Sequence, residues 1–287
     1  MAMLVKERRD TYNGELLDLR NDYVFKAFFG DKRNTDLLLT FLNSILEENI
    51  QSIELTDPHI EGTHQDDKKS IMDVRVETSQ GEQINIEMQM EGHRAFTERM
   101  YMYMAKMYVS QDKVAKKYIE YKRAVQIIIT NFYLLEEAEF HNVYKITNQQ
   151  SGSIFTSHFE THVLELPKLK TKNIMKATEL EKWLLFIKSD QQTKEALAME
   201  SSTMKEAYEE IERLSQNPET QRLAEFRERE LKDINQRLYD AKEDGIEQEK
   251  REIVIKMLEK DYSSEDITEI TGVPLGKVNE IINSMKQ

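Results

Sequence analysis

Two neighbouring runs of alternating apolar and polar residues constrain the fold of this chain more than any other feature. They are residues 71–78 (IMDVRVET) and 83–91 (QINIEMQME). A period of two is typical of a β-strand with one buried face. The short segment between them contains Gly81, so the runs together predict a β-hairpin. The polar face of this hairpin carries the carboxylates of Asp73 and Glu87.

The alternation also constrains the turn, because residues that pair directly across two strands share a face. A two-residue loop ending at Gly81 would place Asp73 opposite Met88 and mix the two faces. A three-residue loop with Gly81 in the left-handed conformation places Asp73 opposite Glu87 or Gln89 instead. We therefore expect the odd loop, although a β-bulge would change the parity.

Other periodicities surround the hairpin. Helical spacing runs from Leu17 to about Leu46, where Gly30 is expected to end the first of two helices. After the hairpin, the segment FTERMYMYMAKMY has helical spacing. Three strand-like segments follow it, RAVQIIITNF, VYKIT and SHFETHVLEL. The order helix, hairpin, helix and three strands predicts a mixed α/β domain.

Only helical periodicity is present after Pro167. Trp183 lies on an apolar helix face and is expected in a core or an interface. Further on, Gly245 is expected to end a helix, and the last segment resembles a helix-turn-helix. An apolar seam in this half predicts a short coiled coil or helical hairpin; its residues are Leu231, Ile234, Leu238 and Ala241.

This shift in character suggests three parts. They are a mixed α/β domain over 1–170, a helical or coiled-coil linker region over 171–250, and a small helical end over 251–287. We expect the helical C-terminal half to assemble a homodimer.

Composition limits the functions that are open to the chain. It has no cysteine, which excludes thiolate metal sites and cysteine nucleophiles. The net charge of −13 argues against a purely electrostatic nucleic-acid binder, but it does not exclude a DNA enzyme with a local basic groove. The sequence contains neither a long apolar run nor an apolar leader. We therefore expect a cytoplasmic protein with no membrane partner.

The polar face of the hairpin is the strongest candidate for chemistry. Asp73, Glu87 and Gln89 would form an oxygen-rich site that suits Mg²⁺, with Mn²⁺ as a substitute. Such a site can polarise a phosphoryl group and activate a water for in-line attack. A solvated strand face is the competing interpretation. Asp22 before the hairpin favours the functional interpretation, as do Arg99 and Tyr103, which are spaced for one helix face after it.

The motifs DLRNDYVFKAFFG, IMDVRVET and INIEMQM, followed by FTERMYMYMAKMY, together resemble a known family. This is the recombination-promoting nuclease/putative transposase family of the PD-(D/E)XK nuclease superfamily, and the resemblance covers roughly residues 14–170. It implies a restriction-endonuclease-like α/β core, in which helices flank a central mixed sheet. Here an all-helical C-terminal extension would follow. It also implies magnesium-dependent cleavage of DNA in recombination.

The resemblance implies roles for individual residues. Asp73 matches the metal-binding Asp of the first strand, and Glu87 matches the acidic residue of the (D/E)XK strand. Gln89 stands where the superfamily has Lys, which implies slower turnover because less positive charge stabilises the transition state. Asp22 matches an acidic position that can complete the metal site. Lys26, one turn further on, can meet a phosphate.

Other basic residues are candidates for DNA contacts. Arg94 and Arg99 can hold phosphates near the site, although Arg99 can equally brace the core through a buried hydrogen bond. Lys116 and Lys117 belong to the basic segment KVAKKYIEYKR, for which a solvated helix end is the alternative. His158 and His162 are four residues apart, but in a strand-like run, so we do not expect a histidine metal site.

We therefore predict a magnesium-dependent DNA endonuclease that makes nicks or breaks promoting recombination. The alternative is a catalytically weak scaffold that keeps the nuclease fold and binds DNA or protein through its helical C-terminal half. Cleavage of RNA cannot be separated from cleavage of DNA by sequence.

Overall fold

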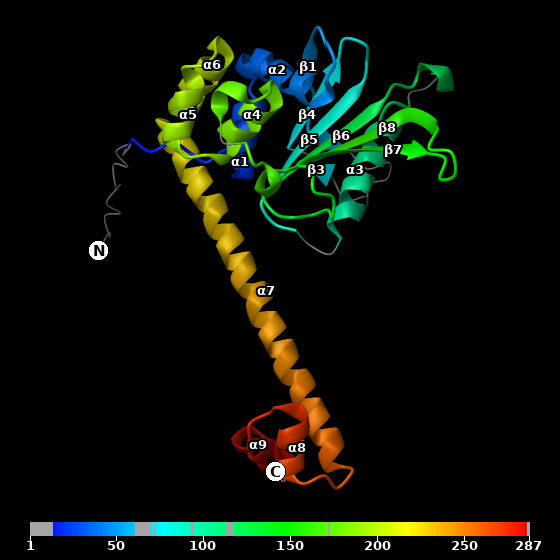
Figure 1. Ribbon diagram of the computed structural model, residues 1–287, viewed down its shortest axis with the longest axis vertical. Helices are drawn as coiled ribbons and strands as arrows, with labels where there is room; N and C mark the ends of the chain where they lie inside the picture. Colours follow the sequence, from blue (N-terminus) through cyan, green and yellow to red (C-terminus); the bar gives the residue numbers. More distant parts are fainter. Residues whose placement is uncertain are drawn as a thin grey trace, which may run out of the picture. The chain divides into compact units, whose positions relative to one another are not determined.

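The computed structural model describes residues 14–60, 70–71, 73–92, 95–112, 117–171 and 173–285. Arg94 and Lys116, two of the expected DNA contacts, lie outside the described residues. A six-stranded sheet in the order β1-β4-β5-β6-β8-β7 forms the centre of the fold (Figure 1). Its strands are β1 (Ile53–Leu55), β4 (Val74–Thr78), β5 (Gln83–Gln89), β6 (Ala124–Thr130), β7 (His141–Thr147) and β8 (Ile154–Glu165). The sheet is mixed, because β5, β6 and β8 run parallel while the other pairs are antiparallel.

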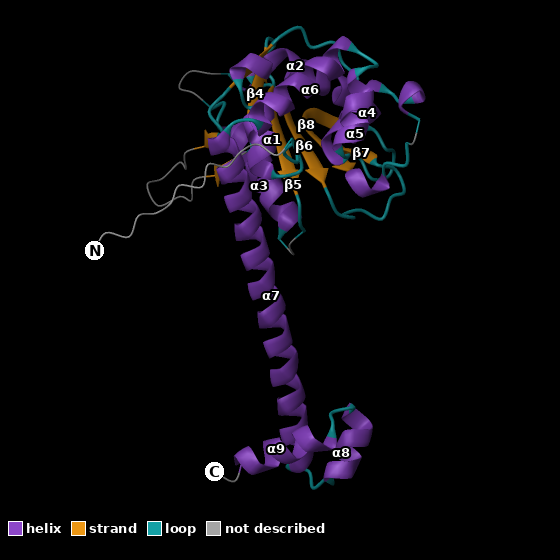
Figure 2. Cartoon of the chain, turned by 90° about the vertical axis from the view of Figure 1, so that its left-hand side faces the viewer, coloured by secondary structure: helices purple, strands orange, loops and turns teal. Residues whose placement is uncertain are grey.

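Helices and short elements complete the described fold (Figure 2). The α-helices are α1 (Asp22–Phe29), α2 (Thr35–Leu46), α3 (Phe96–Val109), α4 (Glu179–Lys188), α5 (Gln191–Ala198), α6 (Ser202–Ser215), α7 (Pro218–Leu258), α8 (Ser264–Thr271) and α9 (Leu275–Met285). The short elements are the strands β2 (His59–Ile60) and β3 (Ser70–Ile71) and the 3-10 turns η1 (Lys32–Asn34), η2 (Tyr118–Glu120), η3 (Leu166–Lys168) and η4 (Ile174–Lys176). This α/β sheet with a helical extension confirms the predicted fold class.

The predicted hairpin is formed by β4 and β5. Val74 pairs with Ile86, and the backbone N–H of Thr78 donates to the carbonyl of Glu82 at 2.9 Å. Gly81 has a φ of +82°, so the loop between Thr78 and Glu82 is the expected three-residue turn with a left-handed glycine. The parity prediction is therefore confirmed.

The two faces of the sheet have different partners. Helices α1, α2 and α4 cover one face, where apolar residues of β4, β5 and β6 join a single large core. Helix α3 packs on the other face, against β5 and β6. The large core extends through α5 and α6 to Ala224 at the start of α7, and Trp183 is fully buried within it. The helices α4 to α6 therefore belong to the same core as the sheet.

Local chemistry sets the bounds of α1. The side chain of Asn21 accepts hydrogen bonds from the backbone N–H groups of Tyr23 and Val24, which makes Asn21 the N-cap. The expected helix start at Leu17 was therefore wrong, because the cap lies several residues later. The N–H of Gly30 donates to the carbonyl of Lys26 at 2.8 Å, so the predicted helix end at Gly30 is confirmed.

The C-terminal helices differ from expectation at Gly245. Helix α7 passes through this residue and ends only at Leu258, so the predicted helix end was wrong. A glycine in a helix interior costs about 1 kcal/mol relative to alanine, which a helix of this length tolerates. Ser263 caps α8, and Gly272 ends it in the left-handed conformation.

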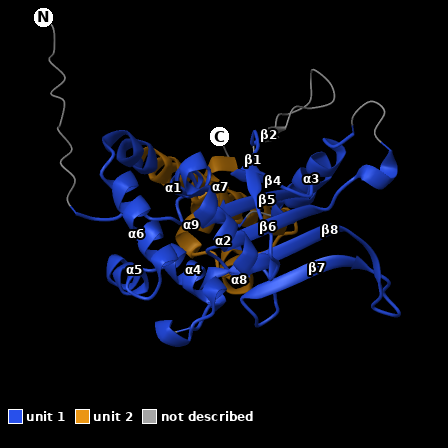
Figure 3. Ribbon diagram, turned by 90° about the horizontal axis from the view of Figure 1, so that it is seen from above, with its two compact units in different colours: residues 1–225 blue, residues 226–287 orange. Residues whose placement is uncertain are grey.

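The chain forms two compact units, residues 1–225 and 226–287 (Figure 3). In the second unit, Val278 and Ile281 of α9 are buried with Val254 and Ile267. The domain boundaries expected from the sequence, at 170 and 250, stay a prediction. Among the described helices, none is long and apolar enough to span a membrane.

Candidate active site

The two hairpin carboxylates meet on the sheet face that carries α3. The backbone N–H of Met88, on β5, donates to Oδ2 of Asp73 at 2.9 Å. Asp73 directly precedes β4, and continuing the β4–β5 register places it opposite Glu87. The side chain of Glu87 is almost completely buried, with 2% of the residue exposed. The hairpin thus holds one partly exposed and one buried carboxylate side by side.

Burial and the negative charge of Asp73 raise the pKa of Glu87 to about 8. The Asn85 side chain opposes this shift, since it donates to Oε1 of Glu87 at 3.0 Å. Two adjacent carboxylates in a site of low dielectric favour either a bound proton or a bound cation. The donor set of hard carboxylate oxygens therefore fits Mg²⁺ or Mn²⁺.

Gln89 lies between Glu87 and a basic side chain. Its Nε2 donates to Oε2 of Glu87 at 3.3 Å, and its Oε1 accepts from Nη2 of Arg99 at 2.9 Å. Arg99 belongs to α3, and its guanidinium also lies over the ring of Phe96 at 5.7 Å. Both roles expected for Arg99, holding a phosphate and bracing the core, stay predictions. The Arg99 side chain places a positive charge beside Gln89. Gln89 is the residue that stands at the position of the superfamily's Lys.

Tyr103 follows Arg99 by one turn of α3. Burial, and then the negative charge of Glu87, raise the pKa of the Tyr103 hydroxyl. The Tyr103 hydroxyl is thus a neutral hydrogen-bonding group at neutral pH. The predicted grouping of Arg99 and Tyr103 on one helix face therefore places both side chains toward the carboxylates.

Two buried amides were not predicted as part of the site. Nδ2 of Asn85 donates both to Glu87 and to Oε1 of Gln126 on β6, the latter at 3.1 Å. Asn85 could have been found from the alternation, because it precedes Glu87 by two residues on the same face. The sequence pointed to Gln126 less strongly, because its only distinguishing feature is that it is a polar residue inside the apolar run of β6.

The remaining expected residues lie on other elements. Asp22 opens α1, which packs against β5, and Lys26 lies one turn further on; both are half-buried. Across the part of the chain that the structure describes, no three Asp, Glu or His side chains group closely enough to hold a metal ion. A role for Asp22 as a third ligand therefore stays a prediction. Lys117 is exposed directly before η2, and its role as a DNA contact also stays a prediction.

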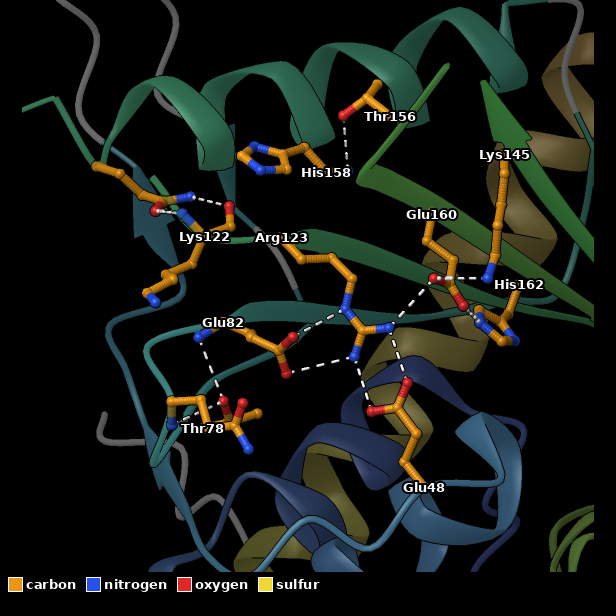
Figure 4. A network of polar contacts seen from close by, with 12 residues as sticks. Glu48, Thr78, Glu82, Lys122, Arg123, Lys145, Thr156, His158, Glu160 and His162 are labelled. Carbon is orange, nitrogen blue, oxygen red and sulfur yellow. Dashed lines mark hydrogen bonds and ion pairs between the residues drawn. The ribbon is translucent and has the colours of Figure 1, made fainter. Parts of the chain in front are cut away.

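The basic segment before β6 is partly neutralised. Arg123, its last residue, pairs with three carboxylates: Glu48 at 2.8 Å, Glu82 at 3.1 Å and Glu160 at 3.2 Å (Figure 4). Burial by itself would raise the pKa of Glu160, but a hydrogen bond from His162 and the charges around it lower the pKa to about 2. The Arg123 guanidinium is therefore surrounded by carboxylates of this chain.

The histidines on β8 have different partners. Nδ1 of His158 lies 2.8 Å from the hydroxyl of Tyr108. Nδ1 of His162 lies 2.9 Å from Nε2 of His141, and its Nε2 lies 2.8 Å from Glu160. Burial, reinforced by His162, lowers the pKa of His141 to about 4, so this imidazole is neutral at neutral pH.

A mixed sheet with helices on both faces fits the α/β nuclease-like class of folds. A family model described as PD-(D/E)XK nuclease family transposase matches residues 19–241. This match covers more than half of the chain, which therefore belongs to that family. The comparisons with curated proteins and with solved structures give no match.

Proposed function

We propose that this chain is a magnesium-dependent DNA endonuclease whose nicks or breaks promote recombination. One observation carries the proposal. The buried carboxylate of Glu87 lies beside Asp73 and is joined through Gln89 to the guanidinium of Arg99. The family model supports a nuclease-related function, and nuclease chemistry needs this combination of anionic metal ligands and a nearby positive charge.

Each residue has a role in this proposal. Asp73 and Glu87 hold the divalent cation, which when bound supplies polarisation of the phosphoryl group and a more acidic water. The hydrogen bond from Arg99 fixes Gln89, which orients the attacking water through its amide. Arg99 itself faces the charge that develops on the phosphate, as a substitute for the missing Lys.

The outer parts of the site are also proposals. Asp22 would support the cation, and Lys26 would meet a phosphate of the DNA. Turnover would be slow, because a guanidinium acting partly through Gln89 stabilises charge less directly than a lysine in contact with the phosphate.

Cleavage of supercoiled plasmid with Mg²⁺ or Mn²⁺ tests this proposal. The variants are Asp73→Asn and Glu87→Gln, which remove charge with little change in volume. Glu98→Gln is the matched control, because Glu98 is exposed on α3 next to Arg99. We expect metal-dependent nicking by the wild type and the control, and a loss of about 100-fold or more in both site variants. Equal cutting by all four proteins would reject the proposed site.

A second candidate function is a scaffold that keeps the nuclease fold and acts through its helical half. It is favoured by apolar side chains on α7 that stay exposed in the single chain, among them Ile234 and Leu238. Binding of Mn²⁺, followed by calorimetry, separates the two functions. A nuclease loses this affinity in Asp73→Asn, whereas a scaffold without a metal site shows none in either protein.

A further inference from the structure

A small cavity lies between α3 and the sheet, beside the candidate active site. Its volume is about 180 Å³. Phe96 and Tyr101 of α3 line one side, while Gln126 and Ile128 of β6 line the other. Pockets for drug-sized ligands measure roughly 300–1,000 Å³, so this cavity suits a smaller group, such as one planar ring system.

The sheet register connects the cavity to the carboxylates. Glu87 pairs with Ile128, and Asn85 pairs with Gln126, so both cavity residues lie one strand away from the site. Neighbouring strands are about 4.8 Å apart. Hydrogen bonds also join Glu87 to Asn85 and Asn85 to Gln126. A group in the cavity would therefore lie within one or two strand spacings of a phosphate held at Asp73 and Glu87.

The cavity wall continues across the sheet in one row. Gln126 pairs with Thr161 on β8, and Thr161 pairs with Tyr144 on β7. All three line the cavity. Most of the cavity wall is apolar, and this row adds an amide, a hydroxyl and an aromatic ring to it. Stacking surfaces together with a few hydrogen-bonding groups suit a heterocyclic base.

The amide of Gln126 is buried and has donor capacity left. Its Oε1 accepts from Asn85, while its Nε2 has the Met100 sulfur, a weak acceptor, at 4.0 Å. An amide nitrogen carries two N–H groups, so it can also donate to a ring nitrogen or a carbonyl in the cavity. Tyr101 is 55% exposed at the mouth, where an incoming base can stack on it.

We infer that this cavity binds one unstacked nucleobase, that of the nucleotide next to the phosphate at Asp73 and Glu87. The inference rests on the proposed function and deepens it, because it makes DNA with an unpaired base the preferred substrate. A base already outside the stack enters without the free energy of unpairing, whereas a paired base must first be extruded.

Binding to two matched duplexes tests the inference without requiring cleavage. One duplex carries a single bulged 2-aminopurine and the other is fully paired, and Ca²⁺ replaces Mg²⁺ to limit cutting. Stacking on one aromatic side chain predicts that the wild type binds the bulged duplex about tenfold more tightly. The 2-aminopurine fluorescence should also change on binding.

Two variants of exposed cavity residues show whether the preference comes from the cavity. Thr97→Trp narrows the mouth, and Tyr101→Ala removes its aromatic ring; both positions are exposed on α3. Both variants should reduce the preference to less than about threefold, while the control Thr97→Ser should keep it. Equal wild-type affinity for the two duplexes, or an unchanged preference in both variants, would overturn the inference.

The same proteins separate this inference from the proposed function. Metal-dependent cutting of plasmid without any preference for the bulge overturns the base-binding role and leaves the nuclease standing. Cavity-dependent binding of the bulged duplex without cutting supports the base-binding role and rejects the nuclease.

Discussion

The backbone N–H of Met88 donates to the carboxylate of Asp73 at 2.9 Å, so the strand that carries Glu87 also holds the second acidic residue in place. This contact fixes two negative groups near each other before any cation binds. Burial and the charge of Asp73 raise the pKa of Glu87, which shows that the arrangement opposes ionisation in the metal-free protein. The candidate site is therefore arranged to bind a cation. Without a cation, the same arrangement lowers the stability of the folded protein when both carboxylates are ionised.

The first prediction concerns pH and stability in EDTA. The pKa of Glu87 is about 8 in the folded state, against 4.5 for an ordinary Glu, so the folded state holds this proton more tightly than the unfolded state does. The favourable contribution of protonated Glu87 to the free energy of unfolding is therefore fully present below pH 4.5, and it is lost as the pH rises toward 8. Glu87→Gln should be more stable than the wild type at pH 7, by on the order of 2–3 kcal/mol, and nearly equal to it at pH 4.5.

Urea unfolding followed by fluorescence measures this difference, since Trp183 is the only tryptophan and is buried in the core. Glu98→Gln serves as the control, because this exposed carboxylate should change stability little at either pH. A Glu87→Gln variant that is less stable than the wild type at pH 7 would contradict the prediction.

The second prediction concerns Arg99. Arg99→Gln removes the charge beside Gln89 and should reduce the cleavage rate by roughly 10²–10³-fold. Arg99→Lys keeps the charge but loses the planar fork, so it should recover only part of the rate. The affinity for Mn²⁺ should change much less than the rate in both variants, because Arg99 donates to Gln89, which is not one of the two proposed metal ligands. A variant that loses Mn²⁺ affinity and rate together would show a merely structural role.

The third prediction concerns the extent of the folding unit. The ring of Trp183 lies 5.8 Å from that of Phe29 and 5.4 Å from that of Phe41, so α4 supplies aromatic packing for α1 and α2. Removal of one such core ring costs about 3–5 kcal/mol, against a total stability of about 5–15 kcal/mol. A chain ending at residue 170 should therefore fail to fold, while one ending at residue 225 should fold.

Circular dichroism and thermal unfolding of the two truncated chains test this. A cooperative transition in the chain that ends at residue 170 would refute the prediction. If the longer one folds, its cleavage rate relative to the full chain measures what residues 226–287 contribute.

The fourth prediction concerns self-association. Ile234 and Leu238 of α7 are 41% and 61% exposed, and they lie on the apolar seam identified in the sequence. A second copy of the helix would bury these side chains. Light scattering should show a dimer for the wild type and a monomer for Leu238→Glu, whereas the control Gln236→Glu, outside the seam, should stay a dimer. A monomeric wild type at tens of micromolar would reject the dimer.

The amino-acid sequence was enough to predict the hairpin and the acidic residues that it carries. Alternation from residues 71 to 91 sets which side chains share a face, and the left-handed Gly81 sets the parity of the turn. Both depend on near neighbours in the chain, so Asp73 and Glu87 could be placed together without a structure. The family resemblance rests on the same short motifs, and the family match confirms it.

Contacts between residues that are far apart in the chain could be seen only in the folded structure. Gln126 meets Asn85 from 41 residues away, and Arg123 meets Glu48 from 75 residues away. Periodicity shows which face a side chain takes, but not which strand lies beside it. The same limit applies to α4. Its apolar face could be predicted from the sequence, but its packing beside α1 and α2 could not. Pairing and packing are decided by the whole folded core, because each contact forms only when distant segments come together.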